Sequence, residues 1–161
     1  MKKLLVCILL TAAWIILIFG FSLCSALGSH MQSMEVKNVL APIAHRLTAL
    51  TNLIHYKDVM PSELFIRKLA HFLEYFVFGI IVSLLLSRIS NSKRRFILIF
   101  IIGPYIAFCD EYIVQFFHAS GRTPSFFDVI IDCTGYFAAV ALFALFHKLR
   151  RFVRSRKAQK T

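Results

Sequence analysis

The sequence predicts an all-α membrane protein, a polytopic bundle of four transmembrane helices with an amphipathic helix on the outer side between the first two. Apolar residues make up 58% of the 161 residues, against roughly 45–50% in soluble domains. Four separate segments are long and apolar enough to cross a hydrocarbon core of about 30 Å. Basic residues gather in alternate connecting segments, as they do in multi-pass proteins. This composition excludes a disordered chain and an ordinary soluble enzyme.

The four predicted spans cover about residues 4–23, 69–87, 96–117 and 126–146, within a single domain over 1–161. The first span has no charged residue, whereas each of the others carries a few ionisable side chains. The first segment also has the basic start of a secretory signal. Its apolar run of twenty residues exceeds the usual length of about 7–15, so we expect an uncleaved helix.

The distribution of basic residues orients the spans. Segments 1–3, 88–95 and 147–161 carry thirteen of the nineteen Lys and Arg residues, and all eight acidic residues lie in the other half of the topology. Because basic residues are enriched in short cytoplasmic loops, we expect both termini in the cytoplasm. The basic tail 147–161 would then attach to anionic lipid at about 1 kcal/mol per charge, and no nucleic-acid partner is expected.

The segment 24–66 is the longest region predicted to lie outside the membrane. Apolar residues recur in it at intervals of three and four, at Val36, Val39, Leu40, Ile43, Leu47, Leu50 and Ile54. This spacing is typical of an amphipathic helix. Pro42 lies within the pattern, where it would kink the helix or begin a second one. We expect this helix to lie in the outer interface or to cap the bundle.

Three carboxylates on three different spans are predicted to lie at one depth. Counted from the basic end of each span at 1.5 Å per residue, Glu74 lies about 21 Å deep and Asp110 and Asp132 about 22 Å deep. This level is about 8 Å inside the outer edge of the core. Ionisable side chains cost about 2.5–3.5 kcal/mol at the centre of a span and usually face the bundle interior. The acids therefore indicate a polar chamber open towards the outer leaflet.

Further polar residues fall on the same predicted helix faces. Arg67, His71 and Glu74 follow one another at helical intervals. The candidates for acid–base chemistry are Glu74, His71, Asp110 and Glu111. The candidates for ligand binding are Arg67, Lys68, Tyr75, Gln115, Arg122, Asp128 and Asp132. Polar side chains also join membrane helices, at about 0.6 kcal/mol each, but this many at one end of a bundle favours a functional site.

The sequence gives no indication of a cofactor or a metal. It contains no P-loop, no Gly-rich dinucleotide-binding turn and no His-Glu-x-x-His zinc spacing. The polar residues include oxygen and nitrogen donors, but Arg67 among them would repel a cation. We therefore predict neither a cofactor nor a metal site.

Three blocks of sequence are notable for their order and spacing. They are residues 67–75, RKLAHFLEY, continuing to Gly79; residues 110–117, DEYIVQFF; and the series Gly121-Arg122, Asp128 and Gly135. Together these blocks resemble the VanZ-like family of integral membrane proteins, which is named for a teicoplanin-resistance protein. The resemblance covers about residues 22–139, most of the chain. The sequence departs from the family pattern at Asp132, where the pattern has Asn, and near Ala139, where it has Gly.

The resemblance implies a small bacterial protein of the cytoplasmic membrane that acts in the cell envelope and contributes to tolerance of the glycopeptide teicoplanin. One function compatible with the residues is binding of an anionic lipid or a phosphate-bearing envelope precursor. Arg67, Lys68 and Arg122 would hold the headgroup through charge-assisted hydrogen bonds. Membrane lipids are then the expected partners, and a homo-oligomer is compatible with the sequence.

Two other functions are compatible with the same residues. An intramembrane hydrolase or transferase would use Glu74, Asp110 or Glu111 as the general base. His71 would act as the acid or would orient the base. A proton-coupled small transporter would use the carboxylates and the histidine as a relay, although four spans are few for that task unless the protein dimerises.

Overall fold

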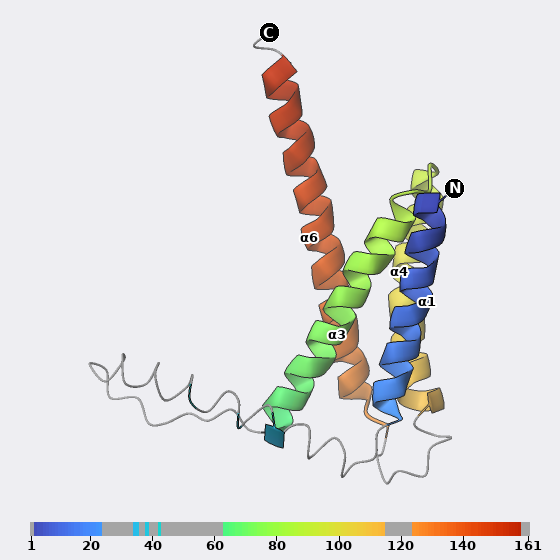
Figure 1. Ribbon diagram of the computed structural model, residues 1–161, viewed down its shortest axis with the longest axis vertical. Coiled ribbons are helices and arrows are strands. Elements are labelled where there is room, and N and C mark those ends of the chain that lie inside the picture. Colours follow the sequence, from blue (N-terminus) through green and yellow to red (C-terminus); the bar gives the residue numbers. More distant parts are fainter. Residues whose placement is uncertain are drawn as a thin grey trace, which may run out of the picture.

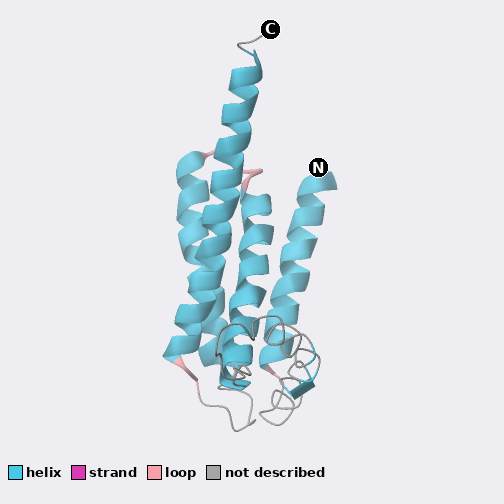
Figure 2. Ribbon diagram, turned by 90° about the vertical axis from the view of Figure 1, so that its left-hand side faces the viewer, coloured by secondary structure: helices cyan, strands magenta, loops and turns pink. Residues whose placement is uncertain are grey.

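The computed structural model describes residues 2–23, 34–35, 38, 42, 63–114 and 124–158. Its elements in these ranges are the helices α1 (Lys2–Ser22), α3 (Glu63–Leu86), α4 (Ser92–Phe108), η1 (Cys109–Val114) and α6 (Phe126–Ala158). Helix η1 is a π-helix that continues directly from α4. Figure 2 shows the long helices running side by side. The amphipathic helix expected within 24–66 falls largely outside the described residues.

Four helices are long and apolar enough to cross a membrane, which confirms the predicted spans. They are Lys2–Ser22, Phe65–Leu86, Ser92–Ile113 and Phe126–Arg156. Large apolar side chains point away from the bundle, among them Ile16 on α1 and Phe127 on α6, which are 71% and 73% exposed. Exposed apolar surface costs roughly 25 cal/mol per Å² in water, so these faces belong against acyl chains. The chain is a multi-pass membrane protein.

Helix α6 is longer than the predicted fourth span. The predicted span ends at residue 146, whereas α6 continues as one helix to Ala158. Its 33 residues correspond to about 50 Å of length, and its last part extends beyond the other helices (Figure 1). No Gly or Pro follows Gly135 in the sequence to interrupt it. Residues 147–158 of the basic tail therefore continue the helix.

The long helices alternate in direction, so that both chain ends lie at the same end of the bundle (Figure 1). The Asn91 side chain accepts a hydrogen bond of 3.0 Å from the Arg94 N–H and caps the start of α4 after the turn from α3. We call the end with the termini and segment 88–95 the basic end. The opposite end, where α1 finishes and α3 and α6 begin, is called the acidic end.

Helix α3 packs most closely against α6, and glycine permits this approach. A Cβ atom on Gly79 would lie 2.6 Å from the Tyr136 carbonyl oxygen, and a Cβ atom on Gly135 would overlap the Phe72 carbonyl. Small residues let the backbones of membrane helices come this close. The crossing of α3 and α6 is therefore fixed by two glycines, one on each helix.

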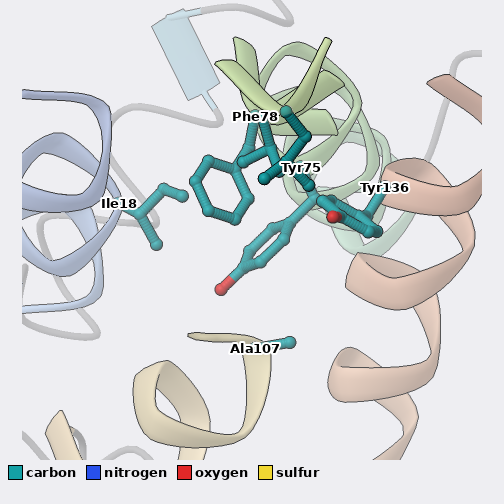
Figure 3. Close-up of a cluster of buried hydrophobic side chains, with 7 residues drawn as sticks. Ile18, Tyr75, Phe78, Ala107 and Tyr136 are labelled. Carbon is teal, nitrogen blue, oxygen red and sulfur yellow. The ribbon is translucent and has the colours of Figure 1, made fainter. Parts of the chain in front are cut away.

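The buried core lies where this crossing meets α1 and α4. In Figure 3 the side chains that converge there are Ile18 of α1, Tyr75 and Phe78 of α3, Ala107 of α4 and Tyr136 of α6. All five are fully buried. The Tyr136 hydroxyl donates a hydrogen bond of 3.0 Å to the Ile99 carbonyl and so joins α6 to α4. The core lies between the acidic and basic ends and holds the four spans together.

Candidate functional site

Four ionisable side chains from three elements come together towards the acidic end. We call them the carboxylate–histidine cluster: His71 and Glu74 of α3, Asp110 of η1 and Asp132 of α6. Each of the three carboxylates is close enough to the other two to interact with them electrostatically. Asp110 is 1% exposed and Asp132 is 0% exposed. Burial of several charged groups inside membrane spans is costly and usually marks a functional site.

His71 and Asp132 link α3 to α6 within the cluster. The His71 Nδ1 atom lies 3.4 Å from the Asp132 Oδ1 atom. This separation is suitable for an ion pair when the imidazole is protonated, but the contact does not meet the geometry of a hydrogen bond. The pair therefore brings an imidazole of α3 and a carboxylate of α6 within ion-pair distance.

Asp110 is held by α3 and α1. The Tyr75 hydroxyl donates a hydrogen bond of 3.3 Å to Asp110 Oδ2, and Figure 3 shows the Tyr75 ring reaching from α3 into the space between α1 and α4. The Ser22 hydroxyl, at the end of α1, lies beside the same carboxylate. The indole N–H of Trp14 donates to the Glu74 backbone carbonyl over 3.1 Å. Helix α1 thus forms one wall of the cluster.

The π-helix η1 explains how two consecutive acids are both buried. Cys109, Asp110 and Glu111 are each at most 9% exposed. A π-helical turn inserts an extra residue into the helix and alters the directions of the side chains that follow, and such turns are frequent at functional sites. Here Asp110 faces Tyr75 of α3, while Glu111 faces the start of α6.

Glu111 has a structural contact at the beginning of α6. Its Oε1 atom accepts a hydrogen bond of 2.6 Å from the Ser125 N–H. Ser125 directly precedes α6, where backbone N–H groups lack partners within the helix. Glu111 therefore joins η1 to α6, and its proposed acid–base role stays a prediction.

Lys68 and Asp128 lie at the rim of the cluster, nearer to the ends of α3 and α6. The Lys68 Nζ atom is 2.6 Å from Asp128 Oδ1, and the two side chains are 34% and 18% exposed. Arg67 is also partly exposed, one residue before Lys68 on α3. The cations of the site are therefore partly exposed, whereas Asp110 and Asp132 are buried.

Several buried atoms of the cluster have no hydrogen-bond partner among the residues that the structure describes. They are His71 Nδ1, Glu74 Oε1, Asp110 Oδ1 and both carboxylate oxygens of Asp132. Most buried polar atoms in proteins are hydrogen-bonded. The cluster can therefore accept hydrogen bonds from a ligand or hold protons. In the described part of the chain, no three metal-binding side chains are arranged to hold one ion.

Comparison with known proteins places these residues in a family. A sequence model of the VanZ/LLP1 family matches residues 7–147, which reach into all four spans and contain the whole cluster. The chain belongs to the VanZ/LLP1 family. The family expected from the sequence blocks at 67–75 and 110–117 is thereby confirmed. No curated protein and no solved structure matches the chain.

Most of the site residues predicted for this VanZ/LLP1 protein fall into two groups in space. The cluster contains four of them, with Tyr75 beside Asp110. Lys68 and Asp128 form the rim. Two other candidates, Gln115 and Arg122, lie outside the described residues. The structure thus brings together predicted residues from three helices, while their roles stay predictions.

Three residues near the carboxylate–histidine cluster are not among the site residues predicted from the sequence. Trp14 and Ser22 belong to α1, which looks uniformly apolar in sequence, and Ser125 lies just before α6. The interval of eight residues between Trp14 and Ser22 places both on one face of α1. This interval is the signal from which the two α1 residues could have been found.

Proposed function

We propose that this VanZ/LLP1 membrane protein binds the headgroup of an anionic lipid or of a phosphate-bearing envelope precursor at the acidic end. One observation carries the proposal: partly exposed cations lie at the rim of a buried group of polar atoms that lack partners among the described residues. A lysine ammonium has three N–H donors. Since Lys68 contacts one Asp128 oxygen, it retains donors for a phosphate.

The surroundings of the site support a lipid as the ligand. Phe65, Phe126 and Phe127 are 57%, 64% and 73% exposed near the starts of α3 and α6. Exposed phenylalanine side chains have no polar atom and belong against acyl chains rather than water. A lipid could therefore keep its chains against the apolar faces of α3 and α6 while its headgroup contacts Lys68 and Arg67.

The site has partly exposed cations at its rim and buried carboxylates further in, and each would bind a different polar group of a headgroup. A phosphate would bind Lys68 and Arg67 at the rim through charge-assisted hydrogen bonds. Deeper in the site, Asp110 and Asp132 would repel a bare phosphate but would accept hydrogen bonds from hydroxyl or amino groups. We infer that the preferred headgroup carries a phosphate together with hydroxyl or amino donors, as sugar-bearing envelope precursors do.

The orientation of the bundle is part of this proposal. The excess of Lys and Arg at the basic end supports a cytoplasmic location for that end, which would put the cluster near the outer leaflet. Labelling of single cysteines in a variant without native cysteines tests this orientation. We expect Ala119→Cys to react with an impermeant reagent from outside and Lys160→Cys only from inside. The reverse pattern would contradict the placement.

The contribution to teicoplanin tolerance is proposed on the family resemblance. A protein that holds an envelope precursor in the outer leaflet would alter the exposure of glycopeptide targets. Cells that express the chain should then survive higher teicoplanin concentrations than cells that express Lys68→Gln. Equal susceptibility of the two strains would contradict this role without affecting lipid binding.

Native mass spectrometry of the full chain, released from membranes of known composition, tests headgroup binding. We expect the wild-type protein to retain a phosphate-bearing lipid at the acidic end and Lys68→Gln to retain fewer phosphate-bearing lipids per chain. Lys3→Gln, which removes a cation at the basic end, is the control and should retain the lipid. Equal retention by both variants would show that the acidic end is not the binding site.

A second candidate function is favoured by the contact between His71 and Asp132 at 3.4 Å. An imidazole beside a carboxylate, with Glu74 and Asp110 near it, can donate and accept protons in an intramembrane hydrolase or transferase. Proton-coupled transport would use the same groups. Glu74→Gln and Asp110→Asn should then abolish activity in cells. Full activity of both variants would exclude catalysis and proton relay together.

A further inference from the structure

A second polar feature lies at the basic end of the bundle, away from the carboxylate–histidine cluster. A cavity of about 380 Å³ opens between the end of α3, the first turns of α4 and the second half of α6. Helices α3 and α6 cross and then separate towards this end (Figure 1). Cavities of about 300–1,000 Å³ are typical of small-molecule sites. The space is therefore large enough for a small ligand group.

The polar wall of this cavity is cationic. Arg95 of α4 lines it together with His147, Lys148 and Arg151 of α6. His147 and Arg151 are one turn apart and so lie on the same face of α6. Arg95 is partly buried and lines the cavity from α4, whereas the other basic residues line it from α6. A guanidinium has planar donors that match the geometry of a phosphate.

No acidic residue accompanies these cations in the sequence. There is no Asp or Glu between residues 75 and 109 or after residue 132. The second half of α3, all of α4 and the part of α6 beyond the cluster are therefore free of acids. Lys68 at the acidic end differs, because it contacts Asp128 at 2.6 Å. Several cations around one cavity without an acid raise the local concentration of anions.

Ser83 provides independent support for a ligand. It lines the cavity and is 4% exposed, and its hydroxyl oxygen has no hydrogen-bond partner among the described residues. A serine or threonine inside a helix often donates to the carbonyl four residues earlier, as Thr134 does to Ile130 over 2.7 Å. Because buried hydroxyls are usually hydrogen-bonded, Ser83 is suited to donate to a group inside the cavity.

Apart from Ser87, the remaining wall of the cavity is apolar. It includes Ile99 of α4 and Val140 and Phe143 of α6. These residues lie deeper along the spans than the basic ones, since they precede His147 on α6 and follow Arg95 on α4. The cavity thus offers cations near the end of the bundle and an apolar surface further in. An anion attached to an acyl chain could use both parts.

We propose that this cavity binds a phosphate group. Arg95 and Arg151 supply charge-assisted hydrogen bonds, and the Ser83 hydroxyl supplies a neutral one. The phosphate is the headgroup of a lipid or a free phosphate ion, and both present the same oxygen acceptors to these donors. The site is separate from the one proposed at the acidic end, because it lies across the core from the cluster and contains no carboxylate.

Calorimetric titration of the full chain in a neutral detergent tests the proposal with two probes, dioctanoyl phosphatidic acid and inorganic phosphate. We expect the wild-type protein to bind at least one probe. Arg95→Gln and Arg151→Gln should each bind it with about tenfold lower affinity, because each variant loses one charge-assisted hydrogen bond. Arg150→Gln is the matched control, because Arg150 is an exposed neighbour on α6 that does not line the cavity. It should change the affinity by less than about twofold.

The outcomes separate the two sources of phosphate. Preference for dioctanoyl phosphatidic acid identifies a lipid headgroup, and equal affinity for both probes identifies the free ion. If neither probe binds, or if Arg150→Gln weakens binding as much as Arg95→Gln, the proposal is wrong.

Two further variants show whether a change in affinity comes from this cavity, rather than from misfolding or from the site at the acidic end. Ser83→Ala should weaken binding severalfold while the melting temperature is unchanged, and an unchanged affinity would contradict the role of the hydroxyl. Lys68→Gln, which alters the site proposed at the acidic end, should bind the probe as the wild type does. The two proposals can therefore fail separately.

Discussion

Charged side chains have different surroundings at the two ends of the bundle. At the acidic end, carboxylates are buried between helices, and the groups around them include His71, the Tyr75 hydroxyl and the Ser125 N–H. At the basic end, Arg95 and Arg151 line a cavity in a part of the sequence that has no acids. A charged side chain buried inside a membrane span requires partners. A basic side chain near the lipid headgroups can instead bind anionic lipids or other anions. The contrast therefore indicates two sites of different chemistry on one scaffold.

The largest effect is expected from Gly135→Ala, which would disturb both ends because it separates α3 from α6. The new methyl group would overlap the Phe72 carbonyl, which is backbone and cannot move aside as a side chain can. Overpacking costs about 1–3 kcal/mol and occasionally more, and we expect a cost of about 3 kcal/mol or more here. Thermal unfolding in detergent should show a lower melting temperature. Gly20→Ala is the control, because nothing lies within 4 Å of a Cβ atom at that position. Equal melting temperatures would contradict the close approach of the two helices.

An intermediate effect, confined to the acidic end, is expected from Tyr75→Phe. The variant removes the hydroxyl that donates a hydrogen bond to Asp110 Oδ2. Loss of a hydrogen bond to a buried oxygen lowers the free energy of unfolding by about 1–3 kcal/mol. Tyr105→Phe removes a hydroxyl from a side chain that is 63% exposed and should change the free energy of unfolding by less than about 0.5 kcal/mol. Chemical denaturation of both variants measures the difference. A cost for Tyr105→Phe as large as that for Tyr75→Phe would show that the contact with Asp110 is unimportant.

The smallest effect on stability is expected from Lys68→Gln. Its partner Asp128 lies at 2.6 Å, but the lysine side chain is 34% exposed, and such pairs contribute about 0.2–1 kcal/mol. A double-mutant cycle with Asp128→Asn measures this coupling directly. Retention of the lipid at the acidic end should nevertheless fall strongly, since the proposed role of Lys68 is binding. A coupling energy several times larger would instead indicate a structural ion pair.

The fold could be predicted from sequence because its main determinants are local. Four apolar runs and the alternation of basic segments define the spans without any knowledge of packing. The length of α6 was not predicted, because the change from apolar to basic residues after Phe146 ends the span without ending the helix. The π-helix at Cys109–Val114 was not predicted either, since its register depends on contacts with α3 and α6.

The candidate site could be predicted in part for a similar reason. A constant rise per residue is enough to place Glu74, Asp110 and Asp132 at a common depth, and the structure brings these three together. The contact between Glu111 and Ser125 depends on the π-helical turn. The cavity at the basic end depends on the angle between α3 and α6. Neither feature is encoded in the spacing of polar residues along one helix.

The central claim is that the cluster joins α3 to α6 through His71 and Asp132. A solid-state NMR measurement in lipid bilayers, between ¹⁵N-labelled histidine and ¹³C-labelled aspartate carboxyl groups, tests it most directly. The separation of 3.4 Å between nitrogen and oxygen predicts a nitrogen–carbon distance below about 5 Å, because a C–O bond adds about 1.2 Å. We expect strong dipolar dephasing that disappears in Asp132→Asn. Absence of dephasing in the wild-type protein, or its persistence in Asp132→Asn, would contradict the account.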